Sequence, residues 1–158
     1  MITKVRVDFR LVHGQIIHSW LKATDSDTIC ILDDLLLENP LKKQLLYACT
    51  PRYVHLEIFP MKEGLAFLRK HGEERHFLLL VEQISSGIHV CQQLSIRQLN
   101  IGETVYDPLK KKLANSVYAS VDEIELMNQF LSQGNSIEIQ QLANSKRLLF
   151  NDKKLFML

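Results

Sequence analysis

The sequence predicts an open α/β fold, a single domain with a mostly parallel sheet and helices on both faces. Segments of strand length alternate with amphipathic segments of helix length along most of the 158 residues. Two strand segments, residues 28–32 and 76–81, are almost wholly apolar, which is typical of parallel strands covered on both sides. No repeat, low-complexity tract or linker divides the chain, so one domain is expected over residues 1–158.

The composition excludes several classes of protein. The apolar fraction is 46% and the charged fraction 23%, as in ordinary globular domains. The formal net charge of +1 gives no reason to expect a nucleic-acid partner. No apolar run is as long as a membrane span, and charged residues occupy the start of the chain where a signal peptide needs an apolar core. We therefore expect a cytoplasmic protein.

Cysteine and histidine spacing gives no metal-ligand pattern. Cys30, Cys49 and Cys91 are odd in number and far apart, so they are expected to be reduced thiols in apolar surroundings. No metal or cofactor is expected. Five of the six histidines are interpreted as structural or exposed, and these are His18, His55, His71, His76 and His89.

Local signals place the elements in order. Strands are expected over residues 3–9, 28–32, 53–59, 76–81, 98–101, 117–121 and 137–142. Helices are expected over residues 14–23, 40–48, 60–72, 84–94 and 120–134. Pro40 at a first helical position and Ser120 before two acidic residues mark two of the helix starts. Asp33 and Asp34, which follow the second strand, either cap the next helix or lie at the rim of a site.

Two segments carry less periodicity. Residues 102–115 are expected to form a loop with a basic run at residues 110–112, either solvated or attracting an acidic or phosphorylated partner. Residues 147–158 are unusually apolar for a chain end, and we expect them to pack on the body or on a partner subunit. The second alternative leaves a homo-oligomer open.

The chain is organised around the junction of its first strand and first helix, where His13 stands. Ligands of open α/β sheets bind beyond the carboxyl ends of the strands, and a helix start there favours anions. Arg10 offers a planar fork of donors that matches phosphate oxygens, Gly14 allows close backbone approach, and Gln15 adds an amide donor. Asp8 is suited to orient the imidazole of His13. These residues predict a phosphoryl site.

A simpler interpretation of the same residues is structural. Arg6 and Asp8 lie on one face of the predicted strand, so they could pair only with each other. A single histidine at the end of a strand is more often an ordinary surface residue than a catalyst. The functional interpretation depends on the whole group of residues at this position in the fold.

Residues 6–15 resemble the active-site loop of IIB components of the mannose/fructose/sorbose-type sugar phosphotransferase system (PTS). That family has roughly R-[IV]-D-D-R-L-[IV]-H-G-Q, followed five residues later by a tryptophan, here Trp20. A looser likeness extends over nearly the whole chain. Phe9 stands where the family usually has a carboxylate, and Glu103 stands where it tends to have a second glycine.

The resemblance implies a phosphocarrier. His13 would accept a phosphoryl group on Nδ1 from the phosphohistidine of a IIA component, and it would transfer that group to a sugar imported through IIC and IID components. Arg10 would clamp the phosphate and Asp8 would help to position the ring. The protein would then associate with the inner face of the membrane through IIC and IID.

Two other functions remain open from the sequence. The Phe9 and Glu103 departures fit a non-catalytic regulatory or binding module of the same fold, in which His13 senses phosphate without passing it on. A flavodoxin-like domain that binds a small molecule is a third interpretation, although the chain has no phosphate loop beyond residues 10–15.

Overall fold

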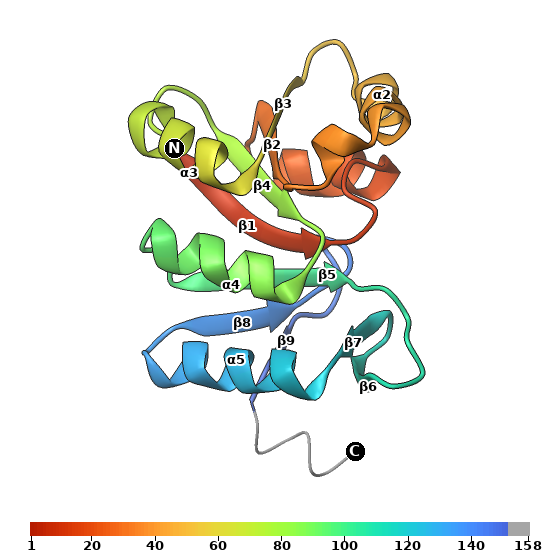
Figure 1. Cartoon of the computed structure of the whole chain (residues 1–158), viewed down its shortest axis with the longest axis vertical. Helices are drawn as coiled ribbons and strands as arrows, with labels where there is room; N and C mark the ends of the chain where they lie inside the picture. Colours follow the sequence, from red (N-terminus) through yellow and green to blue (C-terminus); the bar gives the residue numbers. More distant parts are fainter. Residues whose placement is uncertain (152–158) are drawn as a thin grey trace.

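The structure, a computed structural model, describes residues 1–151. Its main sheet has seven strands in the order β3-β2-β4-β1-β5-β8-β9 (Figure 1). The strands of this sheet are β1 (Ile2–Asp8), β2 (Thr28–Leu32), β3 (His55–Phe59), β4 (Phe77–Val81), β5 (Gln98–Glu103), β8 (Ser136–Ile139) and β9 (Leu148–Leu149). All of its pairings are parallel except that of β8 with β9. The predicted open, mostly parallel sheet is confirmed.

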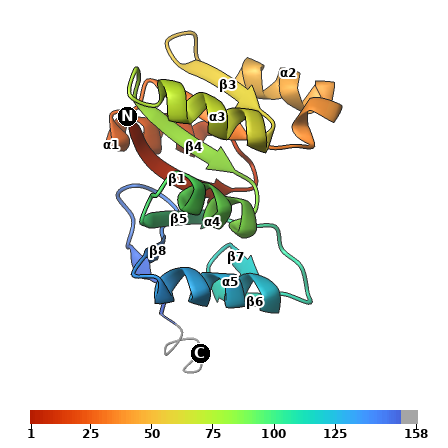
Figure 2. The same ribbon diagram turned by 60° about the vertical axis from the view of Figure 1, so that its left-hand side comes forward.

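The helices cover both faces of the sheet, as predicted (Figures 1 and 2). They are α1 (Leu21–Thr24), preceded by the π-helical turn η1 (Ile16–Trp20), then α2 (Pro40–Cys49), preceded by the 3-10 turn η2 (Leu36–Glu38), and α3 (Met61–His71), α4 (Ile84–Gln93) and α5 (Val121–Ser132). The helices α3, α4 and α5 share one face, and η1, α1 and α2 lie on the other.

Alternation along the central strands builds two apolar cores. In β4, Leu79 and Val81 face the core under α3, α4 and α5, whereas Leu78 and Leu80 face the core under η1 and α2. Both sets are fully buried, as the continuous apolar run predicts. Gly87 allows α4 to pack closely on β1, since a Cβ there would lie 2.8 Å from a methyl group of Val7.

The predicted helix starts are confirmed. The side chain of Asn39 accepts a hydrogen bond from the backbone of Lys42, with Pro40 in the first helical position. Ser120 and Glu123 form a capping box in which each side chain accepts from the other's backbone N–H. These caps satisfy N–H groups that have no partner within the helix.

The structure corrects four expectations. Residues 102–115 are not all loop, because β5 extends to Glu103 and β6 (Lys111–Ala114) pairs with β7 (Val117–Ala119) in an antiparallel hairpin. The first helix contains a π-helical turn, and β8 ends at Ile139 rather than at residue 142. Cys49 is exposed, whereas Cys30 and Cys91 are buried as expected. The strand β6 could not be recognised from the sequence, because it is short, carries two exposed lysines and lacks alternating apolar residues.

The end of the described chain packs on the body. β9 pairs with β8, and the side chain of Phe150 is buried in the core. The rest of the predicted docking tail, residues 152–158, lies outside the described residues. Among residues 1–151, no helix is long and apolar enough to cross a membrane.

Candidate active site

The site forms where the central strand β1 ends and the chain turns into the first helix. Leu11 adopts a left-handed backbone conformation with φ of 55°, and its N–H donates to the carbonyl of Asp8 at 2.9 Å. This tight turn brings His13 back over the end of β1. The carbonyl of His13 accepts from Ile17 N, so the helix begins directly after the histidine, as the sequence predicts.

Asp8 is the centre of the site. Its carboxylate is fully buried, and Oδ2 lies 3.1 Å from both Nε2 of His13 and Nη2 of Arg6. Its other oxygen, Oδ1, accepts from the backbone N–H of Arg10 at 3.2 Å. One carboxylate binds the buried arginine and the histidine at once, so its pairing with Arg6 is compatible with a role at His13.

The charge on Asp8 determines the tautomer of His13. Burial raises the pKa of Asp8, but the hydrogen bond with His13 and the charges of Arg6, His13 and Arg10 outweigh it, so the net pKa is lowered. An ionised carboxylate only accepts hydrogen bonds, so Nε2 of His13 must donate its proton to Asp8. In the neutral ring the lone pair then lies on Nδ1. Nδ1 makes no hydrogen bond with residues 1–151.

Arg6 fixes Asp8 from below. The arginine is fully buried, where Nη1 donates to the side chain of Asn100 at 2.5 Å and to the carbonyl of Gln140 at 2.8 Å. Nη2 donates to the carbonyl of Gln141 at 3.0 Å as well as to Asp8. Burial lowers the pKa of Arg6, and the charge of Asp8 opposes that effect. The guanidinium stays charged at neutral pH and acts as a rigid support for the carboxylate.

Gly102 and Trp20 surround the guanidinium of Arg6. A Cβ at position 102 would lie 1.8 Å from Nη2 of Arg6, so only glycine leaves space for the guanidinium. Trp20 stacks on the other side, with its ring centroid 4.5 Å from Cζ of Arg6, and its indole N–H donates to the carbonyl of Gln141. The tryptophan of the family-like motif therefore belongs to the structure beneath the site.

Arg10 lies on the outer side of Asp8. Its side chain is 33% exposed, with Nε 3.6 Å from Oδ1 of Asp8 and 3.0 Å from Oε2 of Glu103. Nη2 donates to the amide oxygen of Gln15 at 2.9 Å. Gln15 thus orients the arginine through its oxygen. His13 and Arg10 approach the two oxygens of one carboxylate, so both are next to the same point at the end of β1.

The space around Gly14 is open. A Cβ at this position would meet nothing closer than Cδ2 of His18, at 3.9 Å. His13 itself keeps 15% of its side chain exposed. The five residues that the sequence singled out, Asp8, Arg10, His13, Gly14 and Gln15, are therefore brought together at one point.

Sequence reasoning missed several members of the group. Glu103 had been expected at the start of a loop, but it is buried in the site beside Arg10. Asn100, Gly102 and Gln141 were not singled out for a role, because their contacts with Arg6 or Glu103 join segments far apart in sequence. The one available signal was the departure from the family pattern at position 103.

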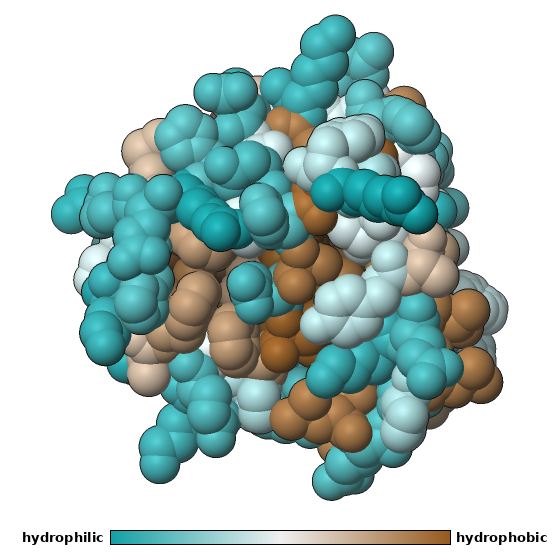
Figure 3. All heavy atoms as spheres, turned by 90° about the horizontal axis from the view of Figure 1, so that it is seen from above, coloured by the Kyte–Doolittle hydropathy of each residue, from teal (hydrophilic) through white to brown (hydrophobic). Residues whose placement is uncertain are grey.

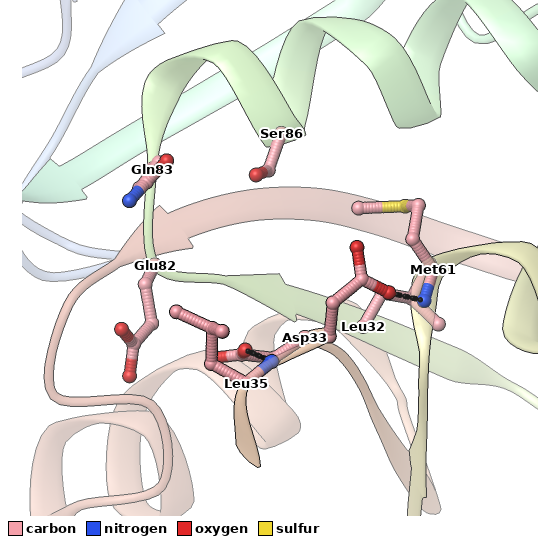
Figure 4. Close-up of a pocket in the computed structure, with 8 residues that line it drawn as sticks. Leu32, Asp33, Leu35, Met61, Glu82, Gln83 and Ser86 are labelled. Carbon is pink, nitrogen blue, oxygen red and sulfur yellow. Dashed lines mark hydrogen bonds between the residues drawn. The ribbon is translucent and has the colours of Figure 1, made fainter. Parts of the chain in front are cut away.

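A second hollow at the same sheet edge is acidic. It lies between the ends of β2 and β4 and the starts of α3 and α4 (Figure 4). Asp33 accepts from the backbone of Leu35 and Leu36, Asp34 from the backbone of Met61, and Glu82 pairs with Lys42. These carboxylates have structural partners, and their negative charge disfavours a phosphate. Asp33 is thus a cap rather than part of the His13 site.

Two of the other histidines have partners outside the His13 site. His71 bonds to Glu74 and His76 to the carbonyl of Asp25. Within the described part of the chain, no group of three or more histidine, cysteine or acidic residues could hold a metal ion.

Comparison with known proteins identifies the family. Residues 2–155 match the family described as "PTS system sorbose subfamily IIB component". This chain belongs to that family. It is a PTS IIB phosphocarrier in sugar phosphotransfer, a component of a protein-phosphohistidine–sugar phosphotransferase. The family works with a IIA phosphodonor and with IIC and IID components. The predicted family, fold and general function are confirmed.

Named relatives of this IIB protein are distant but cover it well. The sorbose-specific EIIB component of Klebsiella pneumoniae is 25% identical over 96% of this chain and 94% of its own length. The fructose-specific EIIB component of Bacillus subtilis is 24% identical, over 90% of this chain and 89% of its own length. The crystal structure of the IIBSor domain from Klebsiella pneumoniae has a TM-score of 0.85 at 22% identity, and the match covers 94% of this chain and 92% of that one. It supports the fold.

Proposed function

We propose that His13 is the residue that carries the phosphoryl group in this IIB protein. It would take the group on Nδ1 from the phosphohistidine of a IIA component and pass it to a sugar that enters through IIC and IID components. The observation that carries this proposal is the 3.1 Å contact between His13 Nε2 and Asp8 Oδ2. Since Nε2 donates to the carboxylate, Nδ1 is left as the nucleophile.

The chemistry of the first step follows from this tautomer. The lone pair of Nδ1 attacks phosphorus as the donor's P–N bond breaks, and that electron pair returns to the donor's imidazole. The product ring bears the phosphoryl on Nδ1 and a proton on Nε2, and Asp8 balances its positive charge. In the second step the P–N bond to His13 breaks, the ring recovers its lone pair, and the sugar oxygen takes the phosphoryl group and releases its proton.

Arg10 is suited to stabilise the charge on the transferring group. It lies beside the same carboxylate as His13 and is partly exposed, so it can reach an incoming phosphoryl oxygen. Guanidinium groups bind phosphate through two parallel N–H bonds. The space around Gly14 is open, and the first N–H groups of the helix have no partner within the helix. Positioning and electrostatics of this kind are sufficient for phosphoryl transfer.

Partner proteins would dock at the carboxyl edge of the sheet, because both transfers happen at His13. In sheet order, the strands that end nearest to β1 are β4 and β5. Exposed apolar side chains flank this edge and extend onto α2, and Figure 3 shows apolar patches on the α2 side of the molecule. They are Leu35, Leu37, Leu41 and Leu45 on one side and Val105, Tyr106 and Leu109 on the other. Docking to IIC and IID would bring the protein to the inner face of the membrane from the cytoplasm.

Phosphotransfer from a phosphorylated IIA protein tests the proposal. Labelled phosphate should appear on the wild-type protein, map to His13 and be lost in mild acid, because a phosphorus–nitrogen bond to imidazole is acid-labile. The variant His13→Ala should stay unlabelled while its fold, followed by circular dichroism, is unchanged. Label on His13→Ala at the wild-type rate would contradict the assignment. An unlabelled wild type with an active donor would favour the regulatory module instead.

A further inference from the structure

Glu103 is a fixed carboxylate inside the phosphoryl site. The residue is 8% exposed, and its backbone carbonyl accepts from the N–H of Phe9 at 3.2 Å. Its Oε1 accepts from the side-chain amide of Gln141 at 2.8 Å, and its Oε2 lies 3.0 Å from Nε of Arg10. Backbone and side chain are thus both held, and the negative charge points at the arginine that we propose binds phosphate.

The charges of the site balance before any phosphoryl group arrives. Arg6 pairs with Asp8, and Arg10 pairs with Glu103. Arg10 is also close to Oδ1 of Asp8 and is tied to Gln15. The guanidinium that could bind a phosphate therefore already has a carboxylate partner.

We propose that Glu103 is a resident counter-anion that competes with the phosphoryl group on His13 for Arg10, and so makes phospho-His13 a readier donor. This proposal rests on the assignment of His13 as the phosphorylated residue. Glu103 acts through Arg10, which makes it a positioning residue.

Either arrangement of the phosphorylated site costs free energy because of Glu103. If Arg10 turns to the phosphoryl group, Glu103 keeps a largely buried negative charge without its cationic partner. If Arg10 stays with Glu103, the phosphoryl group lies near a carboxylate without full neutralisation. The unphosphorylated protein has neither problem. The carboxylate therefore selectively destabilises the phosphorylated state, and departure of the phosphoryl group restores the Arg10–Glu103 pair.

The variant Glu103→Gln isolates the charge. Its amide oxygen can still accept from Gln141, so the side-chain shape and one of its hydrogen bonds remain. Glu103→Ala removes the charge by a second route in case the glutamine variant folds poorly. Glu103→Asp keeps the charge and should stay closer to the wild type. Glu82→Gln is the matched control, because Glu82 directly follows the central strand β4 at the same edge at which Glu103 ends β5, but it pairs with Lys42 rather than with Arg10.

The first measurement does not depend on phosphotransfer. Inorganic phosphate is titrated into each unphosphorylated protein while the imidazole resonances of His13 are followed by NMR. We expect phosphate to bind Glu103→Gln about tenfold more tightly than the wild type, with Glu82→Gln unchanged. Equal affinities for the wild type and both charge-removing variants, or an equal gain in Glu82→Gln, would overturn the proposal.

The second measurement is the lifetime of phospho-His13 after the labelled donor is removed. Glu103→Gln should retain its label several-fold longer than the wild type and Glu82→Gln, and its equilibrium with the IIA donor should shift toward the phosphorylated form. Equal lifetimes in a labelled wild type and a labelled Glu103→Gln would overturn the role of Glu103 and leave the phosphocarrier assignment intact. An unlabelled wild type would instead overturn that assignment, and the phosphate titration then decides the competition for Arg10.

Discussion

Asp8 Oδ2 lies 3.1 Å from Nε2 of His13, and the same oxygen accepts from Nη2 of Arg6. One atom thus links a fully buried cation to the partly exposed ring of His13. The stability of the central strand and the tautomer of the histidine therefore depend on the same carboxylate.

Replacing Asp8 with asparagine should damage both properties. Asp8→Asn leaves the buried Arg6 without its carboxylate, which we expect to lower the free energy of unfolding by about 3–5 kcal/mol at pH 7. An amide can also present an N–H to Nε2 and favour the wrong tautomer, so transfer from IIA should slow by about a hundredfold or more. Urea unfolding and single-turnover transfer measure the two effects. Wild-type transfer in the folded fraction would contradict the tautomer argument.

The contribution of Asp8 to stability should disappear in acid. Its pKa in the folded protein is lowered from the ordinary value of 3.8. The contribution of Asp8 to stability is therefore complete at pH values above its ordinary pKa, and it is lost as the pH falls through the lowered pKa of the folded protein. The difference in unfolding free energy between wild type and Asp8→Asn should be constant from about pH 5 to 7 and shrink below about pH 4. A difference that grows in acid would have the wrong sign.

A methyl group at position 102 should unfold the support of the site. In Gly102→Ala the new Cβ would lie 1.8 Å from Nη2 of Arg6, and four hydrogen bonds through Nη1 and Nη2 hold that guanidinium in place. We expect a loss of about 3 kcal/mol or more in unfolding free energy. Gly14→Ala is the matched control, because its Cβ would have open space and should leave stability almost unchanged. Similar stabilities of the two variants would refute the steric argument.

Most of the fold could be predicted from the sequence because each central strand is recognisable from its own residues. The apolar runs of β2 and β4 are recognisable without any partner, and caps such as that of Ser120 depend on residues three positions apart. The strand β6, and with it the hairpin, was missed because Lys111 and Lys112 are exposed on a short strand, whereas β7 lies within the strand predicted at residues 117–121. Pairing of this kind depends on segments that meet only after folding.

The site was only partly predictable for the same reason. Asp8, Arg10, His13, Gly14 and Gln15 form one continuous motif. A pair between Arg6 and Asp8 was one alternative from the sequence, but burial of Arg6 against Asn100 and the carbonyls of residues 140 and 141 was not predicted. The approach of Glu103 to Arg10 joins the end of β5 to the turn after its parallel neighbour β1, and no local spacing in the sequence predicts it.

The three cysteines should differ sharply in reactivity. Burial raises the pKa of Cys30 and of Cys91 to about 12 in each case, whereas Cys49 is exposed at the end of α2. A thiol reagent at pH 8 should label Cys49 alone, because the reactive species is the thiolate. Peptide mapping before and after unfolding in urea tests this expectation. Rapid labelling of Cys30 in the folded protein would contradict its position in the core.

Phe9 should contribute to binding of the IIA partner. It directly follows Asp8, and its backbone N–H is already fixed to Glu103. Aromatic side chains often anchor interfaces, so Phe9→Asp should weaken IIA binding about tenfold or more with little loss of stability. Tyr53→Asp is the matched control, because Tyr53 is an exposed aromatic residue before β3, at the opposite edge of the sheet. Lower stability with unchanged affinity in Phe9→Asp would show that Phe9 only packs beneath the loop.

Arg10→Lys tests whether the site needs the shape of arginine or only its charge. The guanidinium is planar, and it makes two separate contacts: Nη2 donates to Gln15, and the Nε side lies 3.0 Å from a carboxylate oxygen of Glu103 in an ion pair. A lysine ammonium is a single point of charge and cannot reproduce this fork. Transfer from IIA should therefore fall by about tenfold to a hundredfold.

The fold should survive this change, because the side chain of Arg10 is 33% exposed and the buried charge network beneath it belongs to Arg6. Urea midpoints should agree for the wild type, Arg10→Lys and the control Arg52→Lys, whose arginine is exposed before β3. Arg52→Lys should also transfer phosphate at the wild-type rate. If Arg10→Lys also transfers phosphate at the wild-type rate, the site needs only the positive charge of Arg10. The competition with Glu103 would then depend on charge alone and not on bidentate geometry.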